Sequence, residues 1–145
     1  MNQGRIEEAE EEFRQVLKHD PKHVKATRYL VQCIHHNSLL STTGSYSEEG
    51  IEESVNLLEG VLKTNQKDAA LWIQLGTLCA NDRKRFSQAE KAFKSGLKLA
   101  PTSPTALHNY GQLERFRGNL SESKKLLSQA FKIDPENGDY AFSLA

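Results

Sequence analysis

The chain has 145 residues, and its 19 Lys and Arg balance 19 Asp and Glu, so the formal net charge is zero. Basic and acidic residues alternate along the whole length with no basic tail, which argues against binding to nucleic acid or to an anionic membrane. The longest uninterrupted apolar stretch, 69–73, has five residues, whereas a membrane-spanning helix needs about 20. We therefore expect no membrane insertion. The start of the chain is acidic and carries no apolar segment, so no secretory signal is expected.

No motif of enzyme chemistry occurs in the sequence. The glycine-rich phosphate loops, the H-E-x-x-H and G-x-S-x-G motifs and the C-x-x-C pair are all missing, so neither catalysis nor a cofactor is expected. Cys33, His35 and His36 come nearest to a metal site, but residues one or two positions apart on a helix point in different directions, so no metal is expected. Cys33 and Cys79 lie in no disulfide pattern, and unpaired thiols without a secretory signal predict a cytoplasmic location.

Apolar and small residues recur at fixed spacings along the chain. A pattern with steps of four, three and five residues occurs four times, as Ala9, Phe13, Val16 and Pro21; Ser54, Leu58, Val61 and Gln66; Ala89, Phe93, Gly96 and Pro101; and Ser123, Leu127, Ala130 and Pro135. A second pattern with steps of three, one and three precedes the last three copies, as Thr27, Leu30, Val31 and Ile34; Trp72, Leu75, Gly76 and Cys79; and Leu107, Tyr110, Gly111 and Glu114. Both spacings are helical, so each repeat is predicted to contain two helices.

In chain order, the predicted elements are a lone second helix at about 6–19, three complete helix pairs, and the opening of another first helix at 138–145. A Ser/Thr-rich insertion at about 37–49 is predicted to form a surface loop within the first pair. Helix starts are predicted where a side-chain oxygen can accept a bond from a free amide, at Asp68, Ser103 and Ser121. Proline disfavours helix in the residue before it, so the second helices are predicted to end at Asp20-Pro21, Ala100-Pro101 and Asp134-Pro135.

This repeat resembles the tetratricopeptide repeat, whose 34-residue signature stands in the chain as Trp72, Leu75-Gly76, Ala89, Phe93 and Pro101. The resemblance covers almost the entire chain and departs from the family pattern at Gln66, Cys79 and Glu114. It implies an all-α fold, a right-handed α-solenoid of antiparallel helix pairs with about three and a half repeats. A truncated repeat is expected at 1–23, complete repeats at 24–68, 69–103 and 104–137, and a further helix from 138 to 145. Both ends look cut, as in a fragment of a longer array.

The spacing also predicts how the helices pack. Gly76 and Gly111 are expected to let the second helix of each pair approach closely, while Phe93 or Leu127 fills the gap to the next pair. Trp72 is expected to be a buried aromatic residue whose truncation costs about 3 to 5 kcal/mol.

The resemblance implies a concave groove, lined by the exposed face of each first helix, in which a peptide segment of a partner protein binds. The polar residues at these positions are Lys25, Arg28, Gln32, His35, Gln74, Thr77, Asn81, His108, Asn109, Gln112 and Arg115, with Ala70, Ile73 and Thr105 between them. Such hydrogen-bonding and cationic groups can pair with the backbone and the carboxylates of a peptide. The expected function is that of a non-catalytic protein–protein interaction scaffold.

Three alternatives stay open at this point. The repeats could be the recognition or assembly region of a larger enzyme such as a transferase, they could bind RNA, or the exposed terminal helices could form a homo-oligomer. One specialised group of the family grips the acidic tails of heat-shock chaperones with a clamp of Lys, Arg and Asn side chains. The corresponding places here read Arg28, Gln32, Gln74, His108 and Gln112. Only one of them keeps its charge, so tail binding of this kind is not expected.

Overall fold

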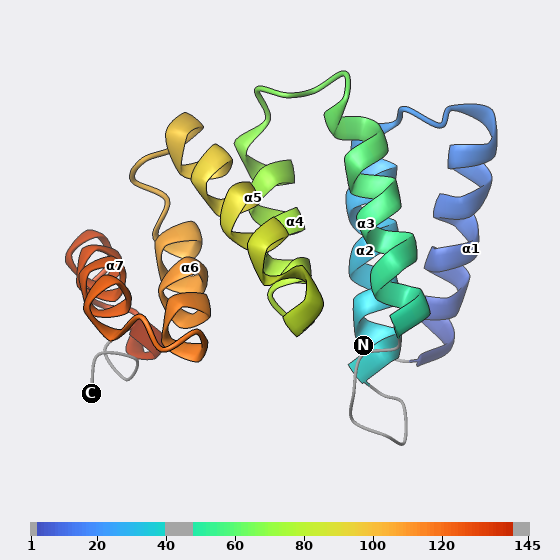
Figure 1. Cartoon of the computed structure of the whole chain (residues 1–145). Coiled ribbons are helices and arrows are strands. Elements are labelled where there is room, and N and C mark those ends of the chain that lie inside the picture. Colours follow the sequence, from blue (N-terminus) through green and yellow to red (C-terminus); the bar gives the residue numbers. More distant parts are fainter. Residues whose placement is uncertain (1–2, 40–47, 141–145) are drawn as a thin grey trace. The chain divides into compact units, whose positions relative to one another are not determined.

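The computed structural model of the chain describes residues 3–39 and 48–140, and within these ranges it is helical with no strand. The elements are α1 (Gln3–His19), α2 (Val24–Leu39), α3 (Glu48–Leu62), α4 (Ala69–Cys79), the 3-10 helix η1 (Arg83–Arg85), α5 (Phe86–Leu99), α6 (Pro104–Phe116) and α7 (Leu120–Ile133) (Figure 1). They group into two compact units, Met1–Gln66 (unit 1) and Lys67–Ala145 (unit 2). The predicted all-α class is confirmed.

Unit 1 contains α1, α2 and α3, and α2 packs against both other helices. Leu30 and Val31 of α2 and Leu58 of α3 are at most 3% exposed and form its core. The apolar side of α1 is less completely buried than that of α3. Val16 of α1 is 38% exposed, whereas Val61, at the same place in the repeat pattern, is 1% exposed. Helix α1 therefore keeps part of its apolar stripe on the surface.

Unit 2 contains two antiparallel helix pairs, α4 with α5 and α6 with α7, and α6 also packs against α5 and α4 (Figure 1). Its core includes Leu71, Leu75, Phe93, Leu113 and Ala130, none of them more than 3% exposed. The apolar positions of the repeat pattern thus face the interior of each pair, as a helical period requires.

Small and large residues interlock within the pairs of unit 2. A β-carbon placed on Gly76 would lie 2.8 Å from the ring of Phe93, and one placed on Gly111 would lie 2.8 Å from Leu127. The Phe93 ring also stacks on Tyr110 of the next pair, with ring centroids 5.7 Å apart. The predicted packing is confirmed: each glycine admits a side chain of the second helix, and Phe93 reaches the following pair.

Two of the three predicted helix starts are confirmed. The Asp68 carboxylate accepts a hydrogen bond from the backbone amide of Leu71, and the Ser103 hydroxyl accepts one from that of Ala106, both at 3.3 Å. The predicted ends are confirmed as well, since α1, α5 and α7 each stop two residues before a proline.

The third predicted start, Ser121, is wrong, because α7 begins at Leu120 and is preceded by Asn119. The Asn119 side chain donates a hydrogen bond of 2.6 Å to the carboxylate of Glu114, and its backbone amide donates one of 2.8 Å to the Glu114 carbonyl. Gly118 between them has a φ of +83°, a left-handed conformation that glycine adopts without strain. These contacts, and not a serine cap, fix the turn between α6 and α7.

Trp72 is less buried than the sequence analysis predicted. Its side chain is half-buried, and the fully buried aromatic residue of this repeat is Phe93, which is 0% exposed. The cost of truncating a side chain grows with the buried apolar surface that is lost and with the cavity that is left. We therefore expect truncation of Phe93, and not of Trp72, to destabilise this repeat most.

Helix covers part of the predicted insertion at 37–49, because α2 continues to Leu39 and α3 already begins at Glu48. The remaining positions, 40–47, lie outside the described residues. Residues 138–140 are helical, as predicted for the start of another first helix, and 141–145 again lie outside the described part. Among the described helices, none has the length and the apolar character needed to cross a membrane.

Candidate peptide-binding surfaces

The eleven predicted groove residues lie on, or just after, first helices of both units. Four lie on α2 of unit 1. In unit 2, six lie on α4 and α6, and Asn81 lies in the turn just after α4.

The α2 face consists of Lys25, Arg28, Tyr29 and Gln32, which together with Val24 line a pocket of about 310 Å³. Successive residues at three- and four-residue spacing share one side of a helix, which is why these side chains gather there. Tyr29, which the sequence reading did not select, is 41% exposed. The pocket therefore joins an apolar ring to two cationic side chains.

Two neighbouring side chains contact the ring of Tyr29. Its ring stacks on Phe13 of α1 with centroids 5.4 Å apart, and the Lys25 ammonium lies 6.0 Å from the ring centroid, at the outer limit of a cation–π contact. The signal that could have found Tyr29 is its position between Arg28 and Gln32 on an exposed helix face. An aromatic residue fixed in this way offers contact area at a low cost in conformational entropy.

His35 lies one turn beyond Gln32 on α2 and is half-buried. Burial lowers the pKa of His35 below its ordinary value, and the neighbouring His36 lowers it further. The neutral imidazole is therefore favoured at pH 7, and the cationic character of α2 comes from Lys25 and Arg28.

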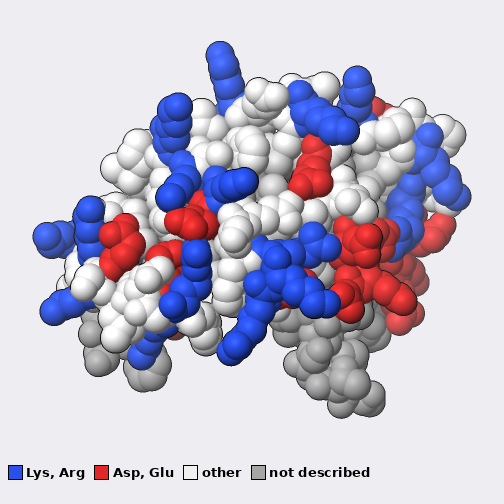
Figure 2. All heavy atoms as spheres, viewed as in Figure 1, with Lys and Arg blue, Asp and Glu red and all other residues white. Residues whose placement is uncertain are grey.

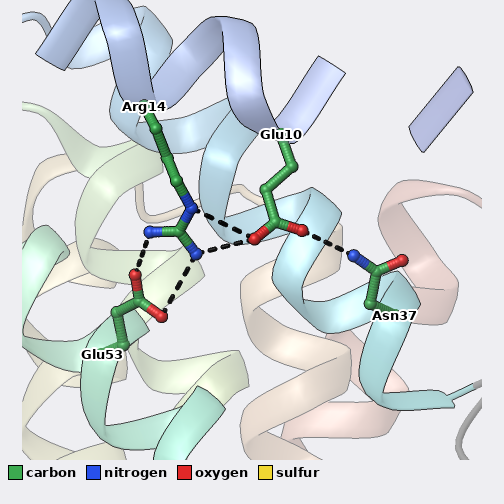
Figure 3. A network of polar contacts seen from close by, with 4 residues as sticks. All are labelled: Glu10, Arg14, Asn37 and Glu53. Atoms are coloured by element: carbon green, nitrogen blue, oxygen red, sulfur yellow. Dashed lines mark hydrogen bonds and ion pairs between the residues drawn. The ribbon is translucent and has the colours of Figure 1, made fainter. Parts of the chain in front are cut away.

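A polar network ties the three helices of unit 1 together (Figure 3). Arg14 of α1 pairs with Glu53 of α3 and, at 2.7 Å, with Glu10 of its own helix. Glu10 in turn accepts a hydrogen bond of 2.6 Å from the amide of Asn37 on α2. The two carboxylates raise the pKa of Arg14 above its usual value, so its charge is permanent. Helix α2 is thus a fixed platform for its exposed side chains.

The α4–α6 face consists of Thr77 of α4, Asn81 in the turn after it, and His108, Asn109 and Gln112 of α6. The Asn109 amide donates a hydrogen bond of 3.0 Å to the Thr77 hydroxyl and so joins the two helices. The Asn81 amide donates to the Thr77 carbonyl at 3.0 Å. On α6, Nδ1 of His108 lies 3.4 Å from the side-chain oxygen Oδ1 of Asn109, and Nε2 of His108 lies 3.5 Å from the side-chain nitrogen Nε2 of Gln112. The structure thus brings five predicted residues into one row of polar contacts.

The other two predicted residues of unit 2 lie apart from this row. Gln74 is half-buried on α4, and Arg115 is exposed in the last turn of α6. Tyr140, which the sequence reading did not select, is 7% exposed and lies against His108 with ring centroids 4.8 Å apart. No spacing pattern within α6 could have indicated this contact, because Tyr140 lies beyond the following helix.

Phe116 is a further residue that the sequence reading missed. It lies four positions after Gln112, at the end of α6, and is 78% exposed. The i+4 spacing from Gln112 was the available signal, since it places both residues on one side of the helix.

An ion-pair network joins α5 to the turn between α6 and α7. Glu90 of α5 accepts hydrogen bonds from Arg117 at 2.6 Å and from Tyr110 at 3.4 Å, and it pairs with Lys94 at 3.0 Å. Arg117 and Lys94 lower the pKa of Glu90 from 4.5 to about 2. Burial, followed by the Glu90 carboxylate, raises the pKa of Tyr110 and keeps its hydroxyl protonated as a donor.

Residues 3–39 and 48–140 contain no group of three or more His, Cys, Asp or Glu side chains that could hold an ion. Cys33 and Cys79 form no disulfide, and burial together with the nearby Glu10 raises the pKa of Cys33.

Taken together, repeated antiparallel helix pairs with interlocking small and large residues define a helical solenoid of repeats. Two sequence models of the tetratricopeptide repeat match the chain, over residues 1–41 and 104–137. The chain belongs to the tetratricopeptide repeat family. No curated relative matches the sequence.

Several solved structures are similar to this chain. TTC0263, a thermophilic TPR protein in Thermus thermophilus, has a TM-score of 0.81 and 21% identity over 97% of this chain and 74% of its own. MamA has a TM-score of 0.80 and 16% identity, covering 97% and 75%. YrrB, a TPR protein with an unusual peptide-binding site, has a TM-score of 0.61 and 15% identity, covering 97% and 84%. At these identities the likeness concerns the fold.

Proposed function

We propose that the chain is a non-catalytic scaffold that binds a peptide segment of a partner protein on the exposed faces of its first helices. The observation that carries this proposal is the polar row of the α4–α6 face, in which Asn109 bonds to Thr77 across two helices at 3.0 Å. A TPR fold supports a role in protein–protein interaction, and the structurally similar YrrB is described as having an unusual peptide-binding site.

The chemistry of the α4–α6 face suits peptide backbone. Asn81, Asn109 and Gln112 carry side-chain amides, each of which can both donate and accept hydrogen bonds. Peptide groups have the same two functions, so an extended segment can satisfy its amides and carbonyls against these side chains. Because contacts along the row already orient the amides, part of the entropy of binding has been lost before the partner arrives.

The α2 face suits a different part of a partner. Lys25 and Arg28 beside the Tyr29 ring favour a segment with a carboxylate and an apolar side chain. The α4–α6 row, by contrast, carries no Lys or Arg, which supports the expectation that an acidic chaperone tail is not the partner.

We also propose a cytoplasmic location. It is supported by Cys33 and Cys79, which form no disulfide, since a reducing compartment keeps cysteines as thiols.

A peptide-display experiment tests the main proposal. Peptides selected against the full chain from a random library should lose at least about tenfold in affinity when Asn109→Ala and Gln112→Ala are combined, because several hydrogen bonds of about 1 kcal/mol each are removed. The matched control combines Lys91→Ala and Gln129→Ala, which are exposed on α5 and α7. Fluorescence anisotropy with labelled peptides measures the affinity, and circular dichroism checks helicity. Equal affinity for the parent chain and the Asn109/Gln112 variant would remove the α4–α6 face as the binding surface.

A further inference from the structure

Two turns of unit 2 lie at the same end of its helices. One joins α4 to α5 and contains η1, and the other joins α6 to α7 (Figure 1). Helix α4 contacts α6, and Arg117, just after α6, pairs at 2.6 Å with Glu90 in the first part of α5. The two turns therefore form one edge of unit 2.

This edge is strongly basic although the whole chain is neutral. Residues 80–91 and 115–125 together contain eight Lys and Arg but only three Asp and Glu. Two of the three acidic residues already pair with Arg, since Asp82 contacts Arg85 and Glu90 contacts Arg117. Figure 2 shows Lys and Arg side chains gathered around this end of α4, α5 and α6. The basic side chains that are exposed here include Arg83, Lys84, Arg115, Lys124 and Lys125.

Two large apolar side chains project from the same edge. Phe116 is 78% exposed and Leu120 is 66% exposed, the highest values among the large apolar residues of the described chain. They flank the tight turn at Gly118, whose φ of +83° reverses the chain between α6 and α7. Leaving two such side chains in water forgoes the free energy of burial, so their position calls for an apolar environment outside the fold.

We propose that this edge docks on an anionic lipid surface. Phe116 and Leu120 enter the boundary between headgroups and acyl chains, while Arg83, Arg115 and Lys124 lie at the level of the lipid phosphates. This combination of protruding apolar side chains and surrounding cations is the arrangement by which proteins lie on a membrane without spanning it.

A bilayer fits the shape of this edge better than other anionic partners do. Side chains that protrude so far need a soft medium or a pocket supplied by the partner, and a lipid surface yields to them without a preformed pocket. Single-stranded nucleic acid would use aromatic rings for stacking, but Leu120 has no π face. The alternation of charge in the sequence hid this feature, because the basic residues come together only when the two turns become neighbours.

Vesicle co-sedimentation tests the proposal with the full chain. Vesicles of phosphatidylcholine mixed with phosphatidylserine should bind the protein, vesicles of phosphatidylcholine alone should bind it at least tenfold more weakly, and added salt should reduce binding. The double variant Phe116→Ser with Leu120→Ser should lose about tenfold or more in partitioning, since two apolar insertions are removed. Arg83→Glu with Lys124→Glu, which leaves both apolar residues in place, should lose at least as much.

The control variant changes exposed apolar residues at the opposite end of unit 2. Leu99 and Ile133 are the last residues of α5 and α7 and are 42% and 44% exposed, so Leu99→Ser with Ile133→Ser should bind vesicles like the parent. Equal loss in this control, no preference for phosphatidylserine, or full binding by either edge variant would overturn the proposal. Tighter binding of the parent to single-stranded RNA than to vesicles would overturn it in favour of nucleic acid.

Discussion

Gly76 and Gly111 show how side-chain size determines helix pairing. Each glycine lies under a large side chain of the second helix, Phe93 or Leu127, and an added β-carbon would come within 2.8 Å of it. Phe93 cannot move away easily, because it is fully buried and stacked on Tyr110. The glycines are therefore needed for close approach of the helices and not for an unusual backbone conformation.

Replacing these glycines with alanine should therefore destabilise the fold, whereas the same replacement at an uncrowded glycine in a helix stabilises it. We expect Gly76→Ala to lower the free energy of unfolding by about 1 to 3 kcal/mol, because the methyl group overpacks the contact with Phe93. Gly60 is the matched control, since it lies in α3 with nothing within 4 Å of its added β-carbon. Gly60→Ala should raise stability by about 0.5 to 1 kcal/mol through helix propensity alone. Urea denaturation followed by circular dichroism measures both, and stabilisation by Gly76→Ala would contradict the packing argument.

Individual residues also mark the limit of what the sequence reveals. The period of the pattern identified Phe93, Gly76 and Leu127 as interior residues, because helical spacing alone decides which side chains face the paired helix. The same pattern predicted too much burial for Trp72, which is half-buried. Spacing shows which side of a helix a residue lies on, but not how much of a large ring the neighbouring helix pair covers.

At the scale of elements, local chemistry predicted most helix ends but not the α6–α7 turn. A proline or a capping side chain acts within a few residues, so its effect can be read from the sequence. The turn after α6 depends instead on Glu114, a carboxylate that is 4% exposed and binds Asn119 at 2.6 Å and Arg117 at 3.4 Å. A buried carboxylate at this place appeared in the sequence only as a departure from the family pattern.

The Glu90 network predicts a pH dependence of this part of the fold. The folded pKa of Glu90 is about 2, below its ordinary 4.5, so its ion pairs contribute stability that is complete above about pH 4.5 and is lost as the pH falls toward 2. Glu90→Gln should therefore lower the urea midpoint at pH 7, and the difference from the parent should shrink progressively below pH 4.5. Glu52→Gln, exposed on α3, is the control. A difference between parent and Glu90→Gln that stays constant from pH 7 to pH 2.5 would show that the network does not stabilise the turn.

In the whole chain, the repeated pattern was enough to predict the fold from the sequence. It predicted only part of the candidate site. Four copies of one pattern predicted paired helices, and five of the predicted groove residues do meet on the α4–α6 face. Tyr29, Phe116 and Tyr140 were missed because their role depends on exposure or on contacts with distant helices. The division into repeats at 24–68, 69–103 and 104–137 stays a prediction.

The exposed apolar side of helix α1 predicts self-association of the chain. Val16 is 38% exposed, Tyr29 beside α1 is 41% exposed, and Phe13 is only half-buried, so an apolar stripe of α1 remains at the surface. A second copy of the chain could cover this stripe and gain the free energy of apolar burial. Light scattering after gel filtration should give the parent chain a mass above that of the monomer at high concentration. Val16→Glu should restore the monomer mass, because self-association would then bury a charge without a partner. Asn56→Glu adds the same charge to the exposed side of α3 and should leave the mass unchanged. A parent chain that stays monomeric at every concentration would show that the α1 stripe does not mediate self-association.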